Sequence, residues 1–196
     1  MSFPTNSKAE ELLAEASLLN PGDWVRHNRV AGNCARIIAS RCEGMDEQRA
    51  YVLGLLHDIG RRFGVNDLKH TIYGYNFMLE QGYYDCAKIC LTHSFPYKDI
   101  GCYNGENDCT EEESLFLQEY IRNTEYDDYD KLIQLCDAIS YTTGPCHIEK
   151  RLVDVVMRRG FNELTVLKWT EFFNIKRHFE MKTNSNLYEL FDKLIY

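Results

Sequence analysis

The apolar positions of this chain recur at helical spacing over most of its length. Residues 9–19 carry apolar side chains three and four positions apart, and Asn20-Pro21-Gly22-Asp23 then ends the pattern, because proline and glycine both disfavour a helix interior. The same spacing predicts helices from about Trp24 to Arg41 and from Glu47 to Asp58. Further helices are predicted over residues 70–80, 85–93, 110–122, 130–140, 149–158, 163–181 and 187–194. Because no stretch alternates with period two for long enough to indicate a strand, we expect an all-α fold.

Two of these helices have a marked inner face. Val30, Cys34 and Ile37 share one stripe of the second helix, and His27 lies one turn before Val30. His27 is therefore expected to face inward. The third helix is apolar on most of its circumference, which is typical of a central, buried helix.

The length and composition indicate one globular domain. The chain has 196 residues, of which 44% are hydrophobic and 27% charged. This is enough apolar surface for one sizeable core and too short a chain for two independent domains. We expect a compact helical core over residues 24–141, with a C-terminal helical extension over residues 146–196. Residues 98–130 are rich in Asp, Glu, Asn and Gly and are expected to form an insertion or lid.

The charge of the chain argues against some partners. Lys and Arg number 22 against 30 Asp and Glu, a formal net charge of −8, and such a surface repels the backbone of nucleic acids. Bulk nucleic acid is therefore not an expected partner. The N-terminal stretch has no basic segment followed by an apolar one, and no apolar run reaches membrane-spanning length. We expect a cytoplasmic protein with no membrane partner, and the sequence leaves its oligomeric state open.

The eight cysteines are expected to be reduced thiols in the cytoplasm. None belongs to a CxxC pair, and Cys86 and Cys90 lie one helical turn apart in an apolar stretch. Free cysteine is among the most buried residue types. We therefore expect small buried side chains in preference to zinc ligands.

His57 and Asp58 are the strongest local signal for chemistry. They are adjacent at the end of the most apolar predicted helix, where a carboxylate without a partner would cost several kcal/mol. Adjacent helical side chains point roughly 100° apart, so both can reach one cation between them. An imidazole with a carboxylate suits Zn, Fe, Mn or Ni. Taken alone, the dipeptide also has a structural interpretation, in which His57 donates to a backbone carbonyl and Asp58 caps the next helix.

Four further residues favour the metal. His27 lies on the inner stripe of the preceding helix, His70 follows one short loop later, and His93 ends another apolar helix. Asp137 interrupts an apolar helical stretch and needs a partner for the same reason as Asp58.

In this order the residues resemble the signature of the HD superfamily of metal-dependent phosphohydrolases, which is His, His-Asp and a distal Asp on an all-helical core. The matching stretches are His27-Asn28-Arg29-Val30-Ala31, Leu55-Leu56-His57-Asp58-Ile59-Gly60-Arg61 and Leu135-Cys136-Asp137-Ala138-Ile139. The resemblance covers residues 24–141. With His70 and His93 in between, the chain is similar to the HDIG subgroup that holds two metals.

The resemblance implies a ligand set and a mechanism. It implies that one metal is held by His27, His57, Asp58 and Asp137, and a second by His70 and His93 with Asp58 bridging. Two divalent transition-metal ions (Fe, Mn, Zn, Ni or Co) are then the expected cofactor. Such metals lower the pKa of bound water from 15.7 towards about 7 and polarise phosphoryl oxygens. We expect hydrolysis of a phosphate ester or anhydride of a nucleotide or similar small molecule; monoesterase, diesterase and dinucleoside polyphosphatase activities all stay open.

A phosphorylated substrate also needs cationic side chains. Arg61 lies three residues after Asp58, and its guanidinium group matches phosphate oxygens bidentately. Asp58 and Arg61 are therefore the expected catalytic residues, and Arg61 the first expected substrate-binding residue. Arg62 and Lys98 are further candidates for substrate binding. His147 and His178 lie outside the pattern and are not expected as ligands.

Two departures from the family pattern leave the substrate open. A long acidic segment separates His93 from Asp137, and Ser94-Phe95-Pro96 stands where HD-GYP phosphodiesterases have a second histidine and Gly-Tyr-Pro. Cleavage of a cyclic dinucleotide is therefore disfavoured. Two alternatives to an enzyme remain: a metal- or nucleotide-binding regulatory module without turnover, and a helical scaffold that binds a protein. The sequence does not identify a general acid.

Overall fold

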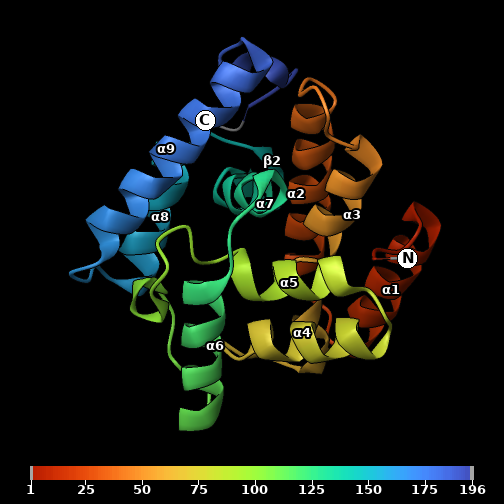
Figure 1. Ribbon diagram of the computed structural model, residues 1–196, viewed down its shortest axis with the longest axis vertical. Coiled ribbons are helices and arrows are strands. Elements are labelled where there is room, and N and C mark those ends of the chain that lie inside the picture. Colours follow the sequence, from red (N-terminus) through yellow and green to blue (C-terminus); the bar gives the residue numbers. More distant parts are fainter. Residues whose placement is uncertain (1, 195–196) are drawn as a thin grey trace.

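The computed structural model describes residues 2–194, and helices dominate them (Figure 1). The α-helices are α1 (Asn6–Leu19), α2 (Asp23–Ala39), α3 (Glu47–Leu56), α4 (His70–Glu80), α5 (Tyr84–Thr92), α6 (Glu111–Asn123), α7 (Asp128–Ala138), α8 (Ile148–Arg159) and α9 (Thr165–Thr183). Short 3-10 helices are η1 (Ile59–Phe63), η2 (Ile100–Cys102) and η3 (Leu187–Leu190). The expected all-α class is confirmed.

Three expectations about single elements are corrected. The third helix ends at Leu56, two residues before the predicted end at Asp58, because the chain turns there into η1. The last predicted helix is only the 3-10 turn η3. A two-stranded antiparallel hairpin, β1 (Ser140–Tyr141) with β2 (Gly144–Pro145), follows α7. It is too short to produce the alternating pattern by which a strand is recognised in a sequence.

The helix α7 occupies the middle of the molecule, between α2 and α3 on one side and α8 and α9 on the other (Figure 1). The helices α4 and α5 pack as a pair across the ends of this group. The largest apolar core is shared by α1, α2, α3, α5, α7 and the C-terminal helices. Of the helices among residues 2–194, none is both long and apolar enough to cross a bilayer.

Two glycines let α2 and α3 approach closely. A Cβ atom on Gly54 would lie 2.8 Å from the Cα of Gly32, and one on Gly32 would lie 2.9 Å from the carbonyl oxygen of Tyr51. The buried Asn28 fastens the same contact, because its side-chain amide donates to the Leu55 carbonyl at 3.0 Å. The close contact brings His27 on α2 beside the end of α3.

A third glycine fixes η1 against the first turn of α4. A Cβ atom on Gly60 would lie 1.9 Å from the carbonyl oxygen of His70 and 2.4 Å from the amide nitrogen of Gly74. Only glycine allows backbones to meet at such distances. The Gly of the His57-Asp58-Ile59-Gly60 sequence therefore places His70 against Asp58.

Buried polar contacts fasten α7 to the end of α5. The Thr92 hydroxyl donates to Asp130 Oδ1 at 2.8 Å, and Gln134 Nε2 donates to the Thr92 carbonyl at 3.0 Å. Lys88 pairs with the other oxygen of Asp130. These bonds set the position of Asp137 on α7 relative to His93, the residue after Thr92.

Residues 98–130 are partly irregular and partly helical. Residues 98–110 contain only η2, and α6 follows behind a capping box formed by Thr110 and Glu113. Leu117 and Ile121 of α6 are fully buried in a second apolar cluster that contains Leu91 and Phe95. The segment is thus packed onto α5 through its own small core.

The cysteines are free thiols, as expected. Seven are buried and Cys109 is partly exposed. Burial raises the pKa of Cys34 to about 12, so these thiols are protonated at neutral pH. Among the described residues, none of the cysteines belongs to a group of side chains that could hold a metal ion.

Candidate metal centre

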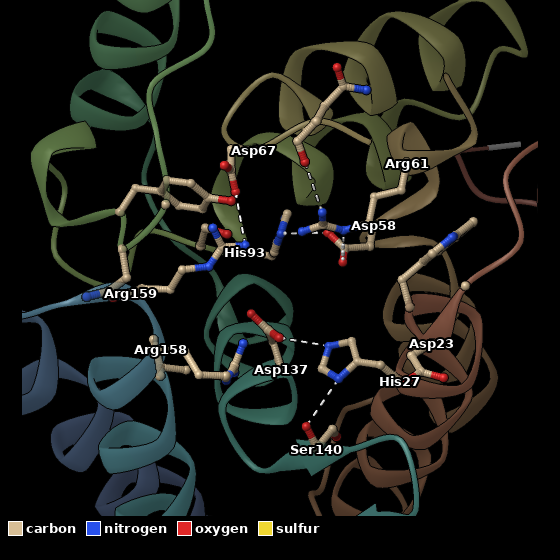
Figure 2. A pocket seen from close by; sticks show the side chains of 18 of the residues that line it. Asp23, His27, Asp58, Arg61, Asp67, His93, Asp137, Ser140, Arg158 and Arg159 are labelled. Carbon is tan, nitrogen blue, oxygen red and sulfur yellow. Dashed lines mark hydrogen bonds and ion pairs between the residues drawn. The ribbon is translucent and has the colours of Figure 1, made fainter. Parts of the chain in front are cut away.

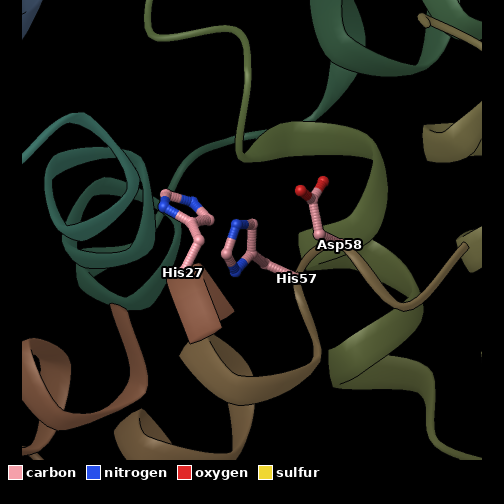
Figure 3. A group of neighbouring side chains, drawn as sticks. All are labelled: His27, His57 and Asp58. Atoms are coloured by element: carbon pink, nitrogen blue, oxygen red, sulfur yellow. The ribbon is translucent and has the colours of Figure 1, made fainter. Parts of the chain in front are cut away.

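Six side chains from five parts of the fold meet in one cluster. They are His27 on α2, His57 and Asp58 between α3 and η1, His70 at the start of α4, His93 directly after α5, and Asp137 on α7. They form three overlapping groups, and within each group the potential ligand atoms lie within 4.8 Å of one another. Figure 3 shows His27, His57 and Asp58, with the two imidazoles side by side and Asp58 beyond His57. The structure therefore brings together all six residues that the sequence pattern singled out.

Each of the four imidazoles turns its Nδ1 atom towards a backbone carbonyl. The partners are the Ser140 oxygen for His27 at 3.1 Å, the Gly54 oxygen for His57 at 2.7 Å, the Asp67 oxygen for His70, and the Ile89 and Cys90 oxygens for His93 at 3.1 Å each. A carbonyl oxygen only accepts, so Nδ1 carries the hydrogen in every case. In the neutral ring, Nε2 then presents its lone pair to the cluster.

At the centre of the cluster, hydrogen-bond acceptors therefore face other acceptors. The Nε2 atom of His27 lies 2.9 Å from Asp137 Oδ1, and the Nε2 atoms of His70 and His93 lie 3.4 Å apart. The Nε2 atom of the fully buried His57 has no hydrogen-bond partner. Lone pairs and carboxylate oxygens at these distances repel one another unless a cation lies among them. The donor set of imidazole nitrogens and carboxylates fits a divalent transition metal.

Burial controls the protonation of the histidines. Removal from water lowers the pKa of His57 to about 4, against the attraction of Asp58. Burial also lowers the pKa of His70, and the nearby Arg61 lowers it further. Both imidazoles are therefore neutral at pH 7, which is the form that binds a metal.

The two carboxyl groups are held ionised despite their burial. Burial alone would raise the pKa of Asp58, but the charge of Arg61 and the contact with His70 bring it well below the ordinary value. Asp137 is affected in the same way, because its contact with the His27 imidazole outweighs the effect of burial and lowers the pKa of the carboxyl group. Two negative charges are therefore available for a metal at neutral pH.

Arg61 contacts the centre directly. Its Nε atom donates to Asp58 Oδ2 at 2.6 Å, and Nη1 donates to the Asn66 carbonyl at 3.2 Å. The other oxygen of Asp58 faces His70 Nε2 at 2.8 Å. Asp58 is thus shared between the arginine and the histidine cluster.

A cleft of about 940 Å³ opens onto this cluster. His27, Asp58, His93 and Asp137 line it, together with Arg61. In Figure 2, His27 approaches Asp137 from one side, and Arg158 and Arg159 of α8 extend towards the same space from the opposite side. The volume lies in the range of pockets that hold nucleotide-sized molecules.

The sequence profile of the HD domain family matches residues 25–142. The chain belongs to the HD domain family. This is the family of metal-dependent phosphohydrolases that the ordered histidines and aspartates indicate, so the resemblance is confirmed. Among solved structures, the HD domain of the L. monocytogenes phosphodiesterase PgpH matches with a TM-score of 0.48 and 16% identity, over 88% of this chain and 97% of that chain. None of the curated proteins matches the sequence.

Two of the expected substrate-binding residues lie away from the cleft of this HD domain. The guanidinium group of Arg62 stacks on the Phe77 ring at 3.9 Å. The Lys98 ammonium donates to the Thr124 carbonyl at 2.6 Å and lies over Tyr126. Neither residue lines the cleft, whereas Arg61 does.

The two histidines not expected as ligands lie outside the cluster. His178 pairs with Asp128 at 2.8 Å, and His147 packs on the ring of Tyr188. Among the described residues, neither belongs to a group of side chains that could hold a metal ion.

Four cationic side chains that the sequence reasoning missed line the cleft of the HD domain. They are Arg151, Arg158 and Arg159 on α8 and Lys168 on α9. Burial lowers the pKa of Lys168, in the direction expected for an ammonium group removed from water. Arg151 and Arg158 are seven residues apart, which puts them on one helix face. That spacing was the available signal, but it does not show that the face turns towards the HD residues.

Proposed function

We propose that this HD domain is a metal-dependent phosphohydrolase that cleaves a phosphate ester or anhydride of a nucleotide or similar small molecule. The observation that carries the proposal is the convergence of four Nε2 lone pairs and two carboxylates in one cluster, of which His27, Asp58, His93 and Asp137 line a cleft. A closed structural site would not need an open cleft beside its ligands. We expect the reaction to take place in the cytoplasm.

We expect the ligands to divide as the resemblance to the family implies. His27, His57, Asp58 and Asp137 would hold one ion, and His70 and His93 a second with Asp58 between the two. Bound divalent metal would supply Lewis acidity towards a phosphoryl oxygen and make water a stronger nucleophile at neutral pH. The metal would be Fe, Mn, Zn, Ni or Co, since the imidazole-carboxylate set suits each of these.

The protein supports this chemistry by holding the four imidazoles in fixed positions and by supplying the positive charge of Arg61. The four Nδ1 hydrogen bonds hold each imidazole in the orientation and tautomer needed to bind metal. Arg61 orients Asp58 through Nε and would use its remaining N–H groups to bind a phosphoryl oxygen of the substrate. In this arrangement Asp58 and Arg61 act at the reacting group.

The test combines metal analysis with a substrate panel. Metal content is measured after purification, and hydrolysis of nucleoside mono-, di- and triphosphates, dinucleoside polyphosphates and phosphodiesters is followed with Mn, Fe, Co or Ni added. Asp58→Asn keeps the shape of the side chain and removes its charge. His178→Ala is the matched control, because that histidine lies outside the cluster on Asp128.

We expect turnover of at least one compound, lost in Asp58→Asn by roughly a thousandfold and retained in His178→Ala. Absence of both metal and turnover under every condition would contradict the proposal. Binding of nucleotides with no hydrolysis by the wild type would favour a regulatory module in its place.

A further inference from the structure

One wall of the cleft carries positive charge that the metal centre does not use. The wall is formed by α8 and α9 and contributes Arg151, Arg158, Arg159 and Lys168 to the lining. Figure 2 shows that Arg158 and Arg159 reach the cleft from the side opposite to Arg61 and Asp58. The HD motif and this wall therefore face the same space from two directions.

Lys168 is the most informative residue of this wall. Only 9% of its surface is exposed, and its ammonium group donates to the Cys102 carbonyl at 3.1 Å and to Asn104 Oδ1 at 3.3 Å. No carboxylate of the described residues lies within ion-pair distance of it, and Asp137 attracts it only from farther away. An ammonium group has three hydrogens to donate, and a buried charge without a close counter-charge is costly. An anion in the cleft would supply that counter-charge.

The arginines of α8 also outnumber their acidic partners. Arg151 and Arg158 both bind Oδ2 of Asp154, at 3.3 Å and 2.8 Å. The Nε atom of Arg151 is buried and has no hydrogen-bond partner. Arg159 pairs with Asp67 at 3.3 Å. The three arginines therefore share two carboxylates and Lys168 pairs with none, which leaves an excess of positive charge on this wall of the cleft.

We propose that this wall is a second anion-binding site, and that the substrate carries two phosphate groups, one held at the HD cluster and one by Lys168 and the α8 arginines. The inference rests on the proposed function and narrows its substrate class to bisphosphorylated or polyphosphorylated small molecules. Guanidinium groups match phosphate oxygens bidentately, which favours phosphate over a lone carboxylate as the second anion. A cleft of about 940 Å³ has room for both groups on one nucleotide-sized molecule.

The first experiment measures anion binding to the metal-free protein. Binding of inorganic phosphate to EDTA-treated full-length protein is followed by calorimetry, because the metal-free HD cluster is acidic and repels phosphate. We expect binding that is roughly tenfold weaker in Lys168→Met and in Arg158→Gln. Arg177→Gln on the exposed side of α9 is the control and keeps wild-type binding. Arg158 is half-exposed, so its variant tests the site even where the buried Lys168→Met fails to fold.

The second experiment compares adenosine 3′,5′-bisphosphate and ADP with AMP as substrates of the metal-loaded enzyme. We expect KM for the compounds with two phosphates to be at least roughly tenfold below that for AMP, and Arg158→Gln to remove this difference. Equal KM values, unchanged by Arg158→Gln, would overturn the inference and leave the proposed phosphohydrolase intact. Phosphate binding that depends on Lys168, without hydrolysis of any compound, would refute the hydrolase and retain the anion site.

Discussion

The Nε2 atoms of His70 and His93 lie 3.4 Å apart, although both rings donate their Nδ1 hydrogens to backbone carbonyls. Two lone pairs therefore point at each other, with Asp58 Oδ1 2.8 Å from His70 Nε2. In water these groups would separate or take up protons. The fold instead holds them close and buried, which is the arrangement expected of a preformed metal site.

This relationship predicts the effect of removing either histidine. His70→Ala and His93→Ala should each lower the metal bound per chain, because the proposed second ion would lose one of its two imidazoles. Metal content is measured by elemental analysis after equilibration with a chosen metal and removal of the excess. His178→Ala should retain the wild-type content, since that histidine pairs with Asp128 outside the cluster. Equal metal content in all four proteins would show that His70 and His93 are structural.

A second prediction concerns the stability of the metal-stripped protein at low pH. The pKa of His57 is about 4 in the folded chain against 6.5 for an unperturbed histidine. Between these values the unfolded chain binds a proton that the folded chain does not, so the free energy of unfolding falls as pH falls from 6.5 to 4. For this residue, the loss from pH 7 to pH 5 is about 2 kcal/mol.

Urea unfolding at the two pH values checks this, with His57→Gln as comparison. The variant keeps a side-chain amide that can donate to the Gly54 carbonyl and has no group that titrates in this range. Its stability should depend less on pH than that of the wild type, by about 2 kcal/mol over the same interval. A variant with the wild-type pH dependence would show that another group takes up the proton.

The helices and the members of the His/Asp cluster were predictable, because the helices leave a periodic pattern in the sequence and the cluster residues follow an ordered motif. His57 follows the most apolar helix, and Asp137 interrupts an apolar stretch, so each is costly unless it has a partner. The end of α3 was predicted two residues late, since Asp58 with φ −104° and ψ 18° starts a turn that periodicity does not register. Helix boundaries depend on such single backbone angles.

The cationic wall of the cleft could not be predicted from the sequence in the same way. Arg158 and Lys168 belong to helices beyond the HD motif, and their facing towards Asp137 depends on how α8 and α9 pack on α7. Arg62, next to Arg61, shows that neighbours in the sequence can point in different directions. Its neighbour reaches the cleft, but η1 turns Arg62 onto the Phe77 ring. The direction in which a side chain leaves a short 3-10 turn is set by tertiary packing.

A third prediction follows from the contact between η1 and α4. Gly60→Ala would put a Cβ atom 1.9 Å from the His70 carbonyl oxygen, which is backbone and cannot move alone. We expect a loss of stability of at least about 3 kcal/mol, at the upper end of overpacking effects. The measurement is the urea midpoint of the metal-stripped protein. Gly101→Ala is the control, since its nearest neighbours are side-chain atoms at 3.1 Å and 3.2 Å, and it should lose less than about 1 kcal/mol.

The last prediction separates substrate binding by Arg61 from metal binding by Asp58. Arg61→Lys keeps the positive charge beside Asp58 but replaces a planar fork with a single ammonium group. Asp58 should stay ionised and metal content should stay at the wild-type level, while kcat/KM falls roughly 10- to 100-fold because charged hydrogen bonds to the phosphoryl group are lost. Arg62→Lys should leave kcat/KM unchanged, as that side chain lies on Phe77 outside the cleft. Loss of metal in Arg61→Lys would instead assign Arg61 to holding Asp58 in place, and the phosphate would then have to be bound by the metals and the opposite wall alone.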